Sequence, residues 1–550
     1  MPRFWLFVSS LYLLLLVASA PVCQSWRLFP AIRFRGGGFR MTRGNGGASS
    51  SWTKSAASIT KILKELDFLN SKLDGSVIVV GHDNLGKDTL LSDLYDKEGG
   101  LTWMKPTPVP LAIVQVASES DVAVAVPILV RLQKDFGIPF RIRSGGHHYN
   151  GYSSVEMGIV LDIGTNLNKI TLCHNDNNGS EEEPLAWIEP SVNGGDIWKQ
   201  LIQKHKLAAI MGGCPAVNQG GFLLGGGFSY WSRLYGLGCD RMVAARVVLA
   251  NGTIVTANAT NSHSDLFWAL RGAGSAGPIG GVVTSFQVKL FPTQDEQVYG
   301  MGKIPSVEEA AHYLTNIGTR TNLPGNAGIT LFLFPKQFYG DEWLSVYNWY
   351  DNGIPQLQTG MTLLNATFRD ALLHPDTARG FGMEIQSGTE HSKMGLMEGR
   401  LWQVWNGFLM PEQCNTQTWT KLLTIMREMR DACEGYVTIE VLLWGGAISD
   451  VSPSETAFFW RRGIYNICVN LGVPAHVENA EVIFERHRAY LSRAWPKVNK
   501  YLQGAYYNYP VQGKKEGNSD VYFGGNVAKL RKIKKQYDPD NVFHHPQSID

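Results

Sequence analysis

The chain has 550 residues, of which 44% are hydrophobic and 18% charged. These values predict a folded protein of two or three domains and exclude a largely disordered chain. The 50 basic and 48 acidic residues nearly balance, which argues against a dedicated nucleic-acid-binding protein.

The first twenty residues have the pattern of a signal peptide. Arg3 is followed by an apolar run from Phe4 to Val17 and by the small residues Ala18-Ser19-Ala20. A transmembrane anchor is the alternative interpretation, but this run of about fourteen residues is shorter than the roughly 20 that span a bilayer. We therefore expect cleavage near residue 20 and no stable membrane insertion.

Residues 21–58 are basic and rich in Gly and Ser, as in a flexible linker or an organelle transit peptide. We expect a secreted protein, or one in the lumen of the secretory pathway. The alternative destination is a complex plastid reached through a bipartite presequence. The secretory route is favoured by four N-glycosylation sequons, at Asn178, Asn251, Asn258 and Asn365.

The seven cysteines contain no CxxC pair, so we expect no structural zinc site and no other bound metal. In a secreted protein some of them would pair as disulfides. The odd number leaves at least one cysteine unpaired, and Cys214 is the candidate.

The folded part is expected to begin near Ile59 and to alternate strands and helices. A capping box, Ser118-x-x-Asp121, opens a helix that should end near Phe136 and kink at Pro127. This order indicates an α/β or α+β arrangement. Strands are expected at 76–80, 112–117, 139–143 and 159–162.

A predicted β-hairpin follows, with strands at 244–250 and 253–257 and Asn251-Gly252 as the signal of a type I′ turn. A short helix over 264–271 and a strand over 281–290 lead to Phe291-Pro292. Beyond this point longer helical stretches appear, at 415–434 and 479–502, so we place a domain boundary near residue 292.

Three glycine-containing segments imitate nucleotide-binding motifs. Residues 80–87 nearly form a P-loop, but Asp88 stands where Ser or Thr would bind Mg²⁺, which disfavours a P-loop NTPase. Residues 272–277 match GxGxxG, but they follow a predicted helix and not the strand that a Rossmann motif requires. Residues 225–227 lack the ribose-binding acid of a βαβ unit.

Two other segments carry a stronger signal. Residues 143–151 read Arg-Ser-Gly-Gly-His-His-Tyr-Asn-Gly at the end of a strand, and residues 212–227 hold Cys214 among seven glycines. Glycines at this density allow a backbone to approach a large planar or phosphate-bearing ligand. His147 and Cys214 are the nucleophiles of the two segments. The alternatives are a metal-binding pair, His147 and His148, and a half-buried free cysteine.

Together these segments resemble the FAD-linked oxidases of the berberine bridge enzyme-like group, in the vanillyl-alcohol oxidase/para-cresol methylhydroxylase superfamily. The resemblance implies an FAD attached twice, through its 8α-methyl group to His147 and through C6 to Cys214. It covers residues 59–550 and includes the closing sequence from Tyr522 to Ile549. It departs at His148, where an acid is common, at Asn218, which replaces a usual Gly, and in the loop after Gly272.

The resemblance implies an α+β fold. A PCMH-type FAD-binding domain of two α/β subdomains is expected over 59–292, and a substrate domain with an antiparallel sheet covered by helices over 293–504. Residues 505–550 are expected to return to the FAD domain. The residues implied to bind the cofactor are His147, Cys214, Arg143, Ser144, Gly145, Gly146, His148, Gly151, Gly220, Gly221, Gly225, Gly226, Gly227, Gly281, Val282 and Asn526.

The resemblance also implies catalytic residues. Tyr506-Tyr-Asn508-Tyr509 is similar to the group's Y-x-N-Y element, in which a tyrosine is the base that removes a hydroxyl proton. We favour Tyr509 as the base and Tyr506 as a wall of the site, with the reverse assignment open, and packing roles for both as the alternative. Glu440 lies on a strand similar to one that lines the substrate side, as a site acid or as an outward residue at a sheet edge. Leu442 stands where sugar oxidases often have an acid, which suggests a less polar substrate.

The implied function is an FAD-dependent oxidase that removes hydride from an alcohol, or from a C–H bond next to a heteroatom, with O₂ as the electron acceptor and H₂O₂ as a product. One alternative is a dehydrogenase of the same fold with another acceptor. The other is a flavin-free binding or defence protein, which the presence of His147, Cys214 and Tyr509 disfavours.

Overall fold

In the computed structural model, the described part of the chain comprises residues 39–40, 53–54, 56–79, 108–173, 183–274, 279–293, 298–319, 323, 325, 327–349, 400–474, 476–511 and 519–549. The predicted signal peptide, most of the 21–58 segment, the P-loop-like residues 80–88, and the sequons at Asn178 and Asn365 lie outside it.

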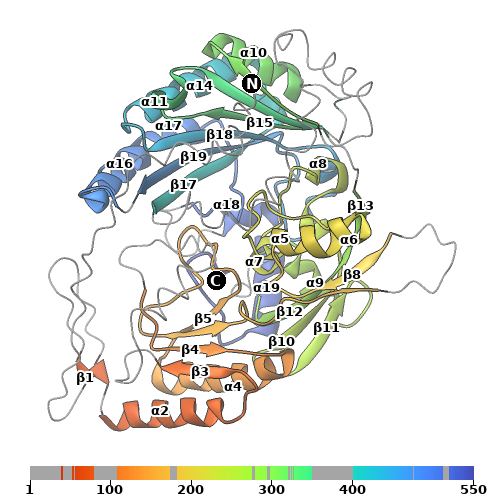
Figure 1. The fold of residues 1–550 in the computed structure, drawn as a ribbon, viewed down its shortest axis with the longest axis vertical. Helices are drawn as coiled ribbons and strands as arrows, with labels where there is room; N and C mark the ends of the chain where they lie inside the picture. The colour runs from red at the N-terminus through yellow and green to blue at the C-terminus, as the bar shows by residue number, and fades with distance from the viewer. Residues whose placement is uncertain are drawn as a thin grey trace.

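The first sheet has four strands in the order β3-β4-β6-β5, with helix α4 against it and helix α2 outside α4 (Figure 1). Strand β3 is antiparallel to β4, and the other pairs are parallel. The Ser118 hydroxyl caps α4 by accepting the Asp121 N–H (3.2 Å), as predicted, and α4 continues through Pro127 as one helix. The bounds are α2 Ala56–Asn70, β3 Ser76–Val79, β4 Ala112–Gln115, α4 Glu119–Phe136, β5 Phe140–Arg143 and β6 Ile159–Asp162.

The second sheet is antiparallel, with the strand order β11-β10-β12-β8-β7. It packs against the first unit through a shared core in which Val248 and Val282 meet α4 residues such as Val126 and Leu129. Glycine-rich helix α7 and helix α9 belong to this part of the chain. The bounds are β7 Ile170–Leu172, β8 Leu185–Ile188, α7 Gln219–Leu224, β10 Met242–Leu249, β11 Ile254–Asn258, α9 Ser264–Leu270 and β12 Gly281–Lys289.

The turn between β10 and β11 corrects one prediction. A type I′ turn needs positive φ at both central residues, but only Gly252 (φ 83°), and not Asn251, has it. The Gly252 N–H donates to Leu249 O, and the Leu249 N–H donates to Thr253 O, each at 2.9 Å. The loop therefore has three residues, Ala250 to Gly252, with glycine in the left-handed position.

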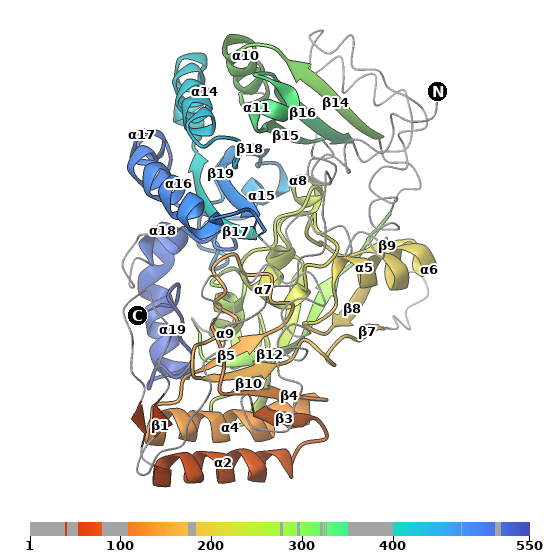
Figure 2. The same cartoon turned by 60° about the vertical axis from the view of Figure 1, so that its left-hand side comes forward.

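The third sheet is antiparallel, with the strand order β14-β16-β15-β18-β19-β17, and helices α10, α14, α16 and α17 lie on one of its faces (Figure 2). In β18 the odd-numbered residues Val437 to Leu443 belong to the core under these helices, whereas Leu442 belongs to the core shared with the second sheet. The even-numbered face of β18 is therefore the inner face of the sheet. The bounds are β14 Val298–Ile304, α10 Val307–Gly318, β15 Ala327–Leu333, β16 Trp343–Trp349, β17 Arg400–Leu409, α14 Thr416–Asp431, β18 Val437–Leu443, β19 Tyr465–Pro474, α16 Ala480–Ala494 and α17 Pro496–Asn499.

The C-terminal segment returns to the first two sheets. Helix α19 places Leu530 and Ile533 in the core of the second sheet, and Val542 and Phe543, which follow the helix, lie in the core of the first. The α+β fold and the helix-covered antiparallel sheet are as predicted. The remaining elements are β1 Phe39–Arg40, β2 Thr53–Lys54, α5 Gly194–Ile197, α6 Gln203–His205, β9 Leu207–Ala208, α8 Ser232–Tyr235, β13 Phe291–Pro292, α11 Lys336–Tyr339, α15 Ala447–Asp450, α18 Asp520–Phe523 and α19 Val527–Tyr537.

A buried ion pair joins the second sheet to the third. Arg461, between β18 and β19, donates to both carboxylate oxygens of Asp240, each at 2.6 Å, and the two side chains are 1% and 8% exposed.

We expect Asp240→Ala to destabilise the protein by about 3–5 kcal/mol, because the Arg461 charge would stay buried without its counter-charge. The measurement is denaturant unfolding. Glu183→Ala, which breaks the more exposed pairs of Glu183 with Arg241 and Lys289, is the control and should cost about 1 kcal/mol or less. Equal losses in the two variants would contradict the prediction.

Candidate active site

The first glycine-rich segment is a turn at the end of β5. The guanidinium of Arg143 folds over Gly146, where a Cβ atom would lie 3.0 Å from the Arg143 side chain. Gly146 also has φ 70°, a left-handed conformation that favours glycine. The turn thus depends on glycine at this position and directs the chain toward His147.

His147 is half-buried, and its Nε2 atom is buried without a hydrogen-bond partner among the described residues. Burial lowers the pKa of His147 to about 4, so the imidazole is neutral at pH 7. A neutral imidazole with an unsatisfied buried nitrogen is suited to hold a ligand.

The second glycine-rich segment packs directly on the first. A Cβ atom on Gly220 would lie 2.9 Å from Ser144 Oγ, and one on Gly145 would lie 2.7 Å from the Asn218 side chain. The Ser144 hydroxyl donates to Pro190 O at 2.7 Å. Asn218, which replaces a glycine in the resemblance, therefore fills the space beside Gly145 and fixes the two segments together.

Cys214 and Gly221 of the second segment are accessible. Cys214 is exposed, and a Cβ atom on Gly221 would meet no atom within 4 Å. Surrounding protein nevertheless raises the pKa of the Cys214 thiol by desolvation, while the N–H groups of Ala216 and Val217 lower it. The neighbouring Gln219 is 1% exposed, and neither polar atom of its amide has a described partner. An open backbone beside unsatisfied polar groups fits a large bound cofactor such as FAD.

The disulfides predicted for a secreted protein are not formed among the described cysteines. Cys173, Cys214, Cys239, Cys414, Cys433 and Cys468 are all free, and the last four are buried. The described residues also contain no group of three or more His, Cys, Asp or Glu side chains placed to hold a metal ion.

Tyr506 and Asn508 bind the triple-glycine turn. The Tyr506 hydroxyl oxygen accepts the N–H groups of Gly227 (3.1 Å) and Phe228 (2.9 Å) and the Asn508 amide (3.0 Å). A Cβ atom on Gly225 would lie 1.9 Å from Asn508 Oδ1, so this contact requires glycine. Burial raises the pKa of Tyr506 to about 12 despite these donors. The geometry gives Tyr506 a positioning role.

We expect Tyr506→Phe to lower the free energy of unfolding by about 2–6 kcal/mol, because it leaves two buried backbone N–H groups, those of Gly227 and Phe228, without an acceptor. The measurement is denaturant unfolding of the purified protein. Tyr501→Phe is the control, because Tyr501 is partly exposed, and the loss of its hydroxyl should cost less than about 0.5 kcal/mol. A similar loss of stability in both variants would contradict the role of Tyr506.

Tyr509 lies in an aromatic cluster at the inner face of the third sheet. Its ring packs edge-on against Tyr149 (5.7 Å between centroids), and Tyr149 stacks with Trp402 (6.1 Å). The Tyr509 hydroxyl has no hydrogen-bond partner among the described residues. Burial raises its pKa well above 10, and the nearby Tyr149 and Glu440 raise it further. A free tyrosine has a pKa near 10, so a positive charge or a hydrogen-bond donor would be needed beside the hydroxyl to favour the phenolate. Among the described residues neither acts on Tyr509.

Glu440 lies near this cluster and not at a sheet edge, which corrects one of the two predicted alternatives. Strand β18 pairs with β15 on one side and β19 on the other. Glu440 accepts a hydrogen bond from the Asn470 amide (3.2 Å), and its charge acts on Tyr149 and Tyr509. Leu442 is on the same face, as the two-residue period of a strand requires.

Asn406 on β17 fastens the Tyr506–Tyr509 segment to the sheet. Its Oδ1 accepts the Tyr506 N–H (2.8 Å), and its Nδ2 donates to Tyr509 O (2.5 Å). Asn466 in turn donates to Asn406 Oδ1 (3.2 Å). Sequence reasoning missed Asn406 and Tyr149. The position of Tyr149, two residues after His147, was a signal that could have identified it.

The C-terminal sequence packs on His148. The His148 ring is within hydrogen-bond distance of Gln547 Oε1 (2.8 Å) and stacks on Tyr152, which stacks on His545. Burial lowers the pKa of His148 to about 4. His148 is therefore neutral at pH 7. An acid, which is common at this position in the group that the sequence resembles, would instead carry a negative charge.

Three predicted cofactor residues have other contacts. Val282 is buried in the core, and a Cβ atom on Gly281 would lie 2.6 Å from the Val247 side chain. The Asn526 amide donates to carbonyls of the 453–457 loop, at 2.7 Å for Pro453. Packing thus accounts for Val282 and for the glycine at position 281, and hydrogen bonds account for the Asn526 side chain, so a contact of these residues with the cofactor stays a prediction.

Comparisons with known proteins agree with this arrangement. A family described as FAD binding domain matches residues 110–258, and one described as berberine and berberine like matches 505–550. An uncharacterised FAD-linked oxidoreductase of Bacillus subtilis (strain 168) is 28% identical over 464 residues, which cover 80% of this chain and 92% of that protein. A reticuline oxidase of Papaver somniferum is 26% identical over 447 residues, covering 74% and 78%. The structure of a chitooligosaccharide oxidase shares the fold, with TM-score 0.72 and 21% identity over 88% of this chain and 99% of that one.

Proposed function

Because the chain is a berberine bridge enzyme-like FAD-linked oxidoreductase, we propose that it oxidises an alcohol, or a C–H bond next to a heteroatom, in a small molecule. When bound, FAD supplies the hydride acceptor that no side chain provides, and O₂ takes the electrons to give H₂O₂. The following roles of the chain's own residues support this proposal.

His147 and Cys214 are proposed to hold the flavin by two covalent bonds. The neutral imidazole of His147 keeps a lone pair for attachment, and Cys214 is exposed. The raised pKa of Cys214 keeps most of it as a thiol at pH 7, so its attachment would require the proton to leave. The contacts of Gly220 with Ser144 and of Gly145 with Asn218 keep the two segments together.

One observation carries the proposal. Tyr149 interacts electrostatically with Cys214, Glu440 and Tyr506, and its ring contacts Tyr509. The proposed attachment residue, base and acid therefore all lie near enough to act on one residue, Tyr149, although they come from distant parts of the chain. A reacting carbon and a hydroxyl group of the substrate can be held there together.

Tyr509 is proposed to accept the hydroxyl proton of an alcohol substrate, because its own hydroxyl has no described partner while that of Tyr506 accepts three N–H groups. Glu440 and the buried, unpartnered Nε1–H of Trp402 offer an acceptor and a donor for orientation. The aromatic rings between them favour a substrate with an apolar body over a simple sugar.

The first test is the absorption spectrum of the purified protein before and after acid precipitation, followed by peroxide detection in air with carbohydrates, alkaloid-like amines, polyketides and lipid alcohols. Colour in the pellet and substrate-dependent peroxide are expected. Substrate-dependent bleaching without peroxide would indicate a dehydrogenase with another acceptor. Folded protein without colour would overturn the proposal and favour a binding protein.

We also propose that the protein enters the secretory pathway after cleavage near residue 20. Among the described residues no helix has the length and apolar composition needed to cross a bilayer. Asn251 is exposed on its hairpin loop, so its sequon is accessible, whereas Asn258 is half-buried. Expression in eukaryotic cells should give a glycosidase-sensitive protein whose mass falls in Asn251→Gln, and an insensitive protein would contradict this route.

A further inference from the structure

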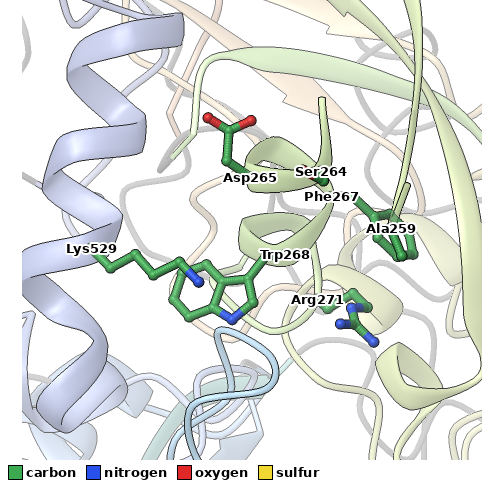
Figure 3. Close-up of a pocket in the computed structure, with 7 residues that line it drawn as sticks. All are labelled: Ala259, Ser264, Asp265, Phe267, Trp268, Arg271 and Lys529. Carbon is green, nitrogen blue, oxygen red and sulfur yellow. The ribbon is translucent and has the colours of Figure 1, made fainter. Parts of the chain in front are cut away.

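A cavity of about 330 Å³ lies between helices α9 and α19, and none of its residues belongs to the candidate active site (Figure 3). Its volume is at the lower end of the range of about 300–1,000 Å³ that is typical of small-ligand sites. The lining residues are Ala259, Ser264, Asp265, Phe267, Trp268, Arg271 and Lys529.

Two cations line this cavity without forming an ion pair among the described residues. Lys529 lies over the Trp268 ring, with Nζ 3.7 Å from the centroid, and Arg271 lies over Phe267 at 5.0 Å. Burial and the Arg271 charge lower the pKa of Lys529, whereas Asp265 raises it. The positive charges of Lys529 and Arg271 therefore exceed the negative charge of Asp265.

Asp265 is the acid of the lining, and it is already engaged. Its Oδ1 accepts the Tyr537 hydroxyl (2.8 Å) and the Leu266 N–H (2.7 Å). In Figure 3 its carboxylate points away from Trp268 and Arg271. With one acid against two cations, the cavity has a net positive charge.

The side chains of Trp268 and Arg271 are held in place by a segment that is distant in the sequence. The Trp268 indole donates to Ser454 O (2.9 Å), and Arg271 donates to Glu455 O (3.0 Å), so the loop before β19 supports both. The Arg271 Nε atom is buried without a described partner. The indole and the guanidinium thus form a fixed apolar and cationic surface that does not require a ligand to assemble it.

We propose that this cavity binds a small organic anion, a carboxylate carried on a flat apolar body. The carboxylate lies between the Arg271 guanidinium and the Lys529 ammonium, and the apolar body contacts the indole of Trp268. A guanidinium recognises a carboxylate through parallel N–H groups, and an ammonium adds a point charge. An inorganic oxyanion would use the two charges but not the aromatic surface.

The probe for this site is benzoate, measured by calorimetric titration of the full-length purified protein at low ionic strength. We expect saturable binding of one benzoate, weakened at least tenfold in Lys529→Gln and in Arg271→Gln. Lys532→Gln removes the same charge from an exposed position on the same helix and should leave the affinity unchanged. Salt should weaken binding, because the cavity is open and its charges are screened.

Two further probes separate the alternatives. Benzyl alcohol, the neutral counterpart, should bind at least tenfold more weakly than benzoate, and inorganic phosphate should also bind more weakly. Equal affinity for benzyl alcohol or for phosphate would overturn the proposal, as would undetectable benzoate binding or equal losses in all three variants. A change in flavin absorbance on benzoate binding that persists in both cavity variants would place benzoate in the active site and also overturn it. The titration requires no turnover, so its failure is distinct from a failure of the proposed oxidase function.

Discussion

Replacing both His147 and Cys214 with alanine is expected to release all flavin from acid-precipitated protein, whereas the wild-type protein should retain it in the pellet. Each single variant should keep covalent flavin through the remaining attachment. The physical basis is the arrangement of the site, in which a neutral His147 and an exposed Cys214 belong to two segments that pack on each other. The measurement is the flavin absorbance of pellet and supernatant, with peptide mapping of the attachment residues.

Cys173→Ala is the control for the effect of removing a cysteine, because Cys173 is partly exposed and lies on the second sheet outside the glycine-rich segments. It should leave all flavin in the pellet. Complete release from either single variant would contradict double attachment and leave one covalent bond. Release from the wild-type protein would remove the covalent proposal while keeping the FAD-binding fold.

Tyr509→Phe is expected to lower turnover of an alcohol substrate by about 10²–10⁴-fold, the usual contribution of a general base, with the flavin colour unchanged. The raised pKa of Tyr509 sets the pH dependence. A base must be deprotonated, so below this pKa the wild-type kcat/KM should rise about tenfold per pH unit as pH increases. This rise should be absent in Tyr509→Phe.

The comparison variant for Tyr509 is Tyr149→Phe, which keeps the ring contact with Tyr509 but removes a neighbouring hydroxyl. Its turnover should fall less than tenfold, and its pH profile should keep the wild-type slope. Unchanged turnover in Tyr509→Phe would transfer the base role to another group. A flat wild-type profile between pH 6 and pH 9, by contrast, would show that proton removal does not limit the reaction.

Local sequence patterns were sufficient for many elements of the fold. The Ser118 hydroxyl defines the start of α4, because it accepts the N–H three residues later without help from the rest of the protein. The second half of the predicted capping box is not formed, since the Asp121 carboxylate accepts the Ala117 N–H instead. The strand over 159–162 was predicted with its observed bounds. The hairpin strands were also predicted, but their turn type was wrong, because the loop length depends on strand register as well as on the Asn-Gly pair.

The residues of the candidate site were identified by motif and resemblance, but their roles were not. The resemblance favours Tyr509 over Tyr506 as the base but leaves the reverse assignment open. Only the folded chain brings Gly227 and Phe228, almost 280 positions earlier, to the Tyr506 hydroxyl. Hydrogen bonds over such separations depend on the packing of whole domains, which local patterns do not encode.

The local sequence determined the alternation of strands and helices and the position of the two glycine-rich segments, because short-range sterics and strand and helix periods act over a few residues. The α+β fold class and the attachment roles of His147 and Cys214 were implied by the resemblance. The tertiary structure decided which face of β18 carries Glu440 inward and which tyrosine hydroxyl is free. It also decided that Tyr149 contacts the Tyr509 ring and lies within electrostatic range of Cys214. It also placed Lys529 beside Trp268, from helices more than 250 residues apart. These outcomes depend on contacts between segments distant in sequence, and their energies are set only when the three sheets pack together.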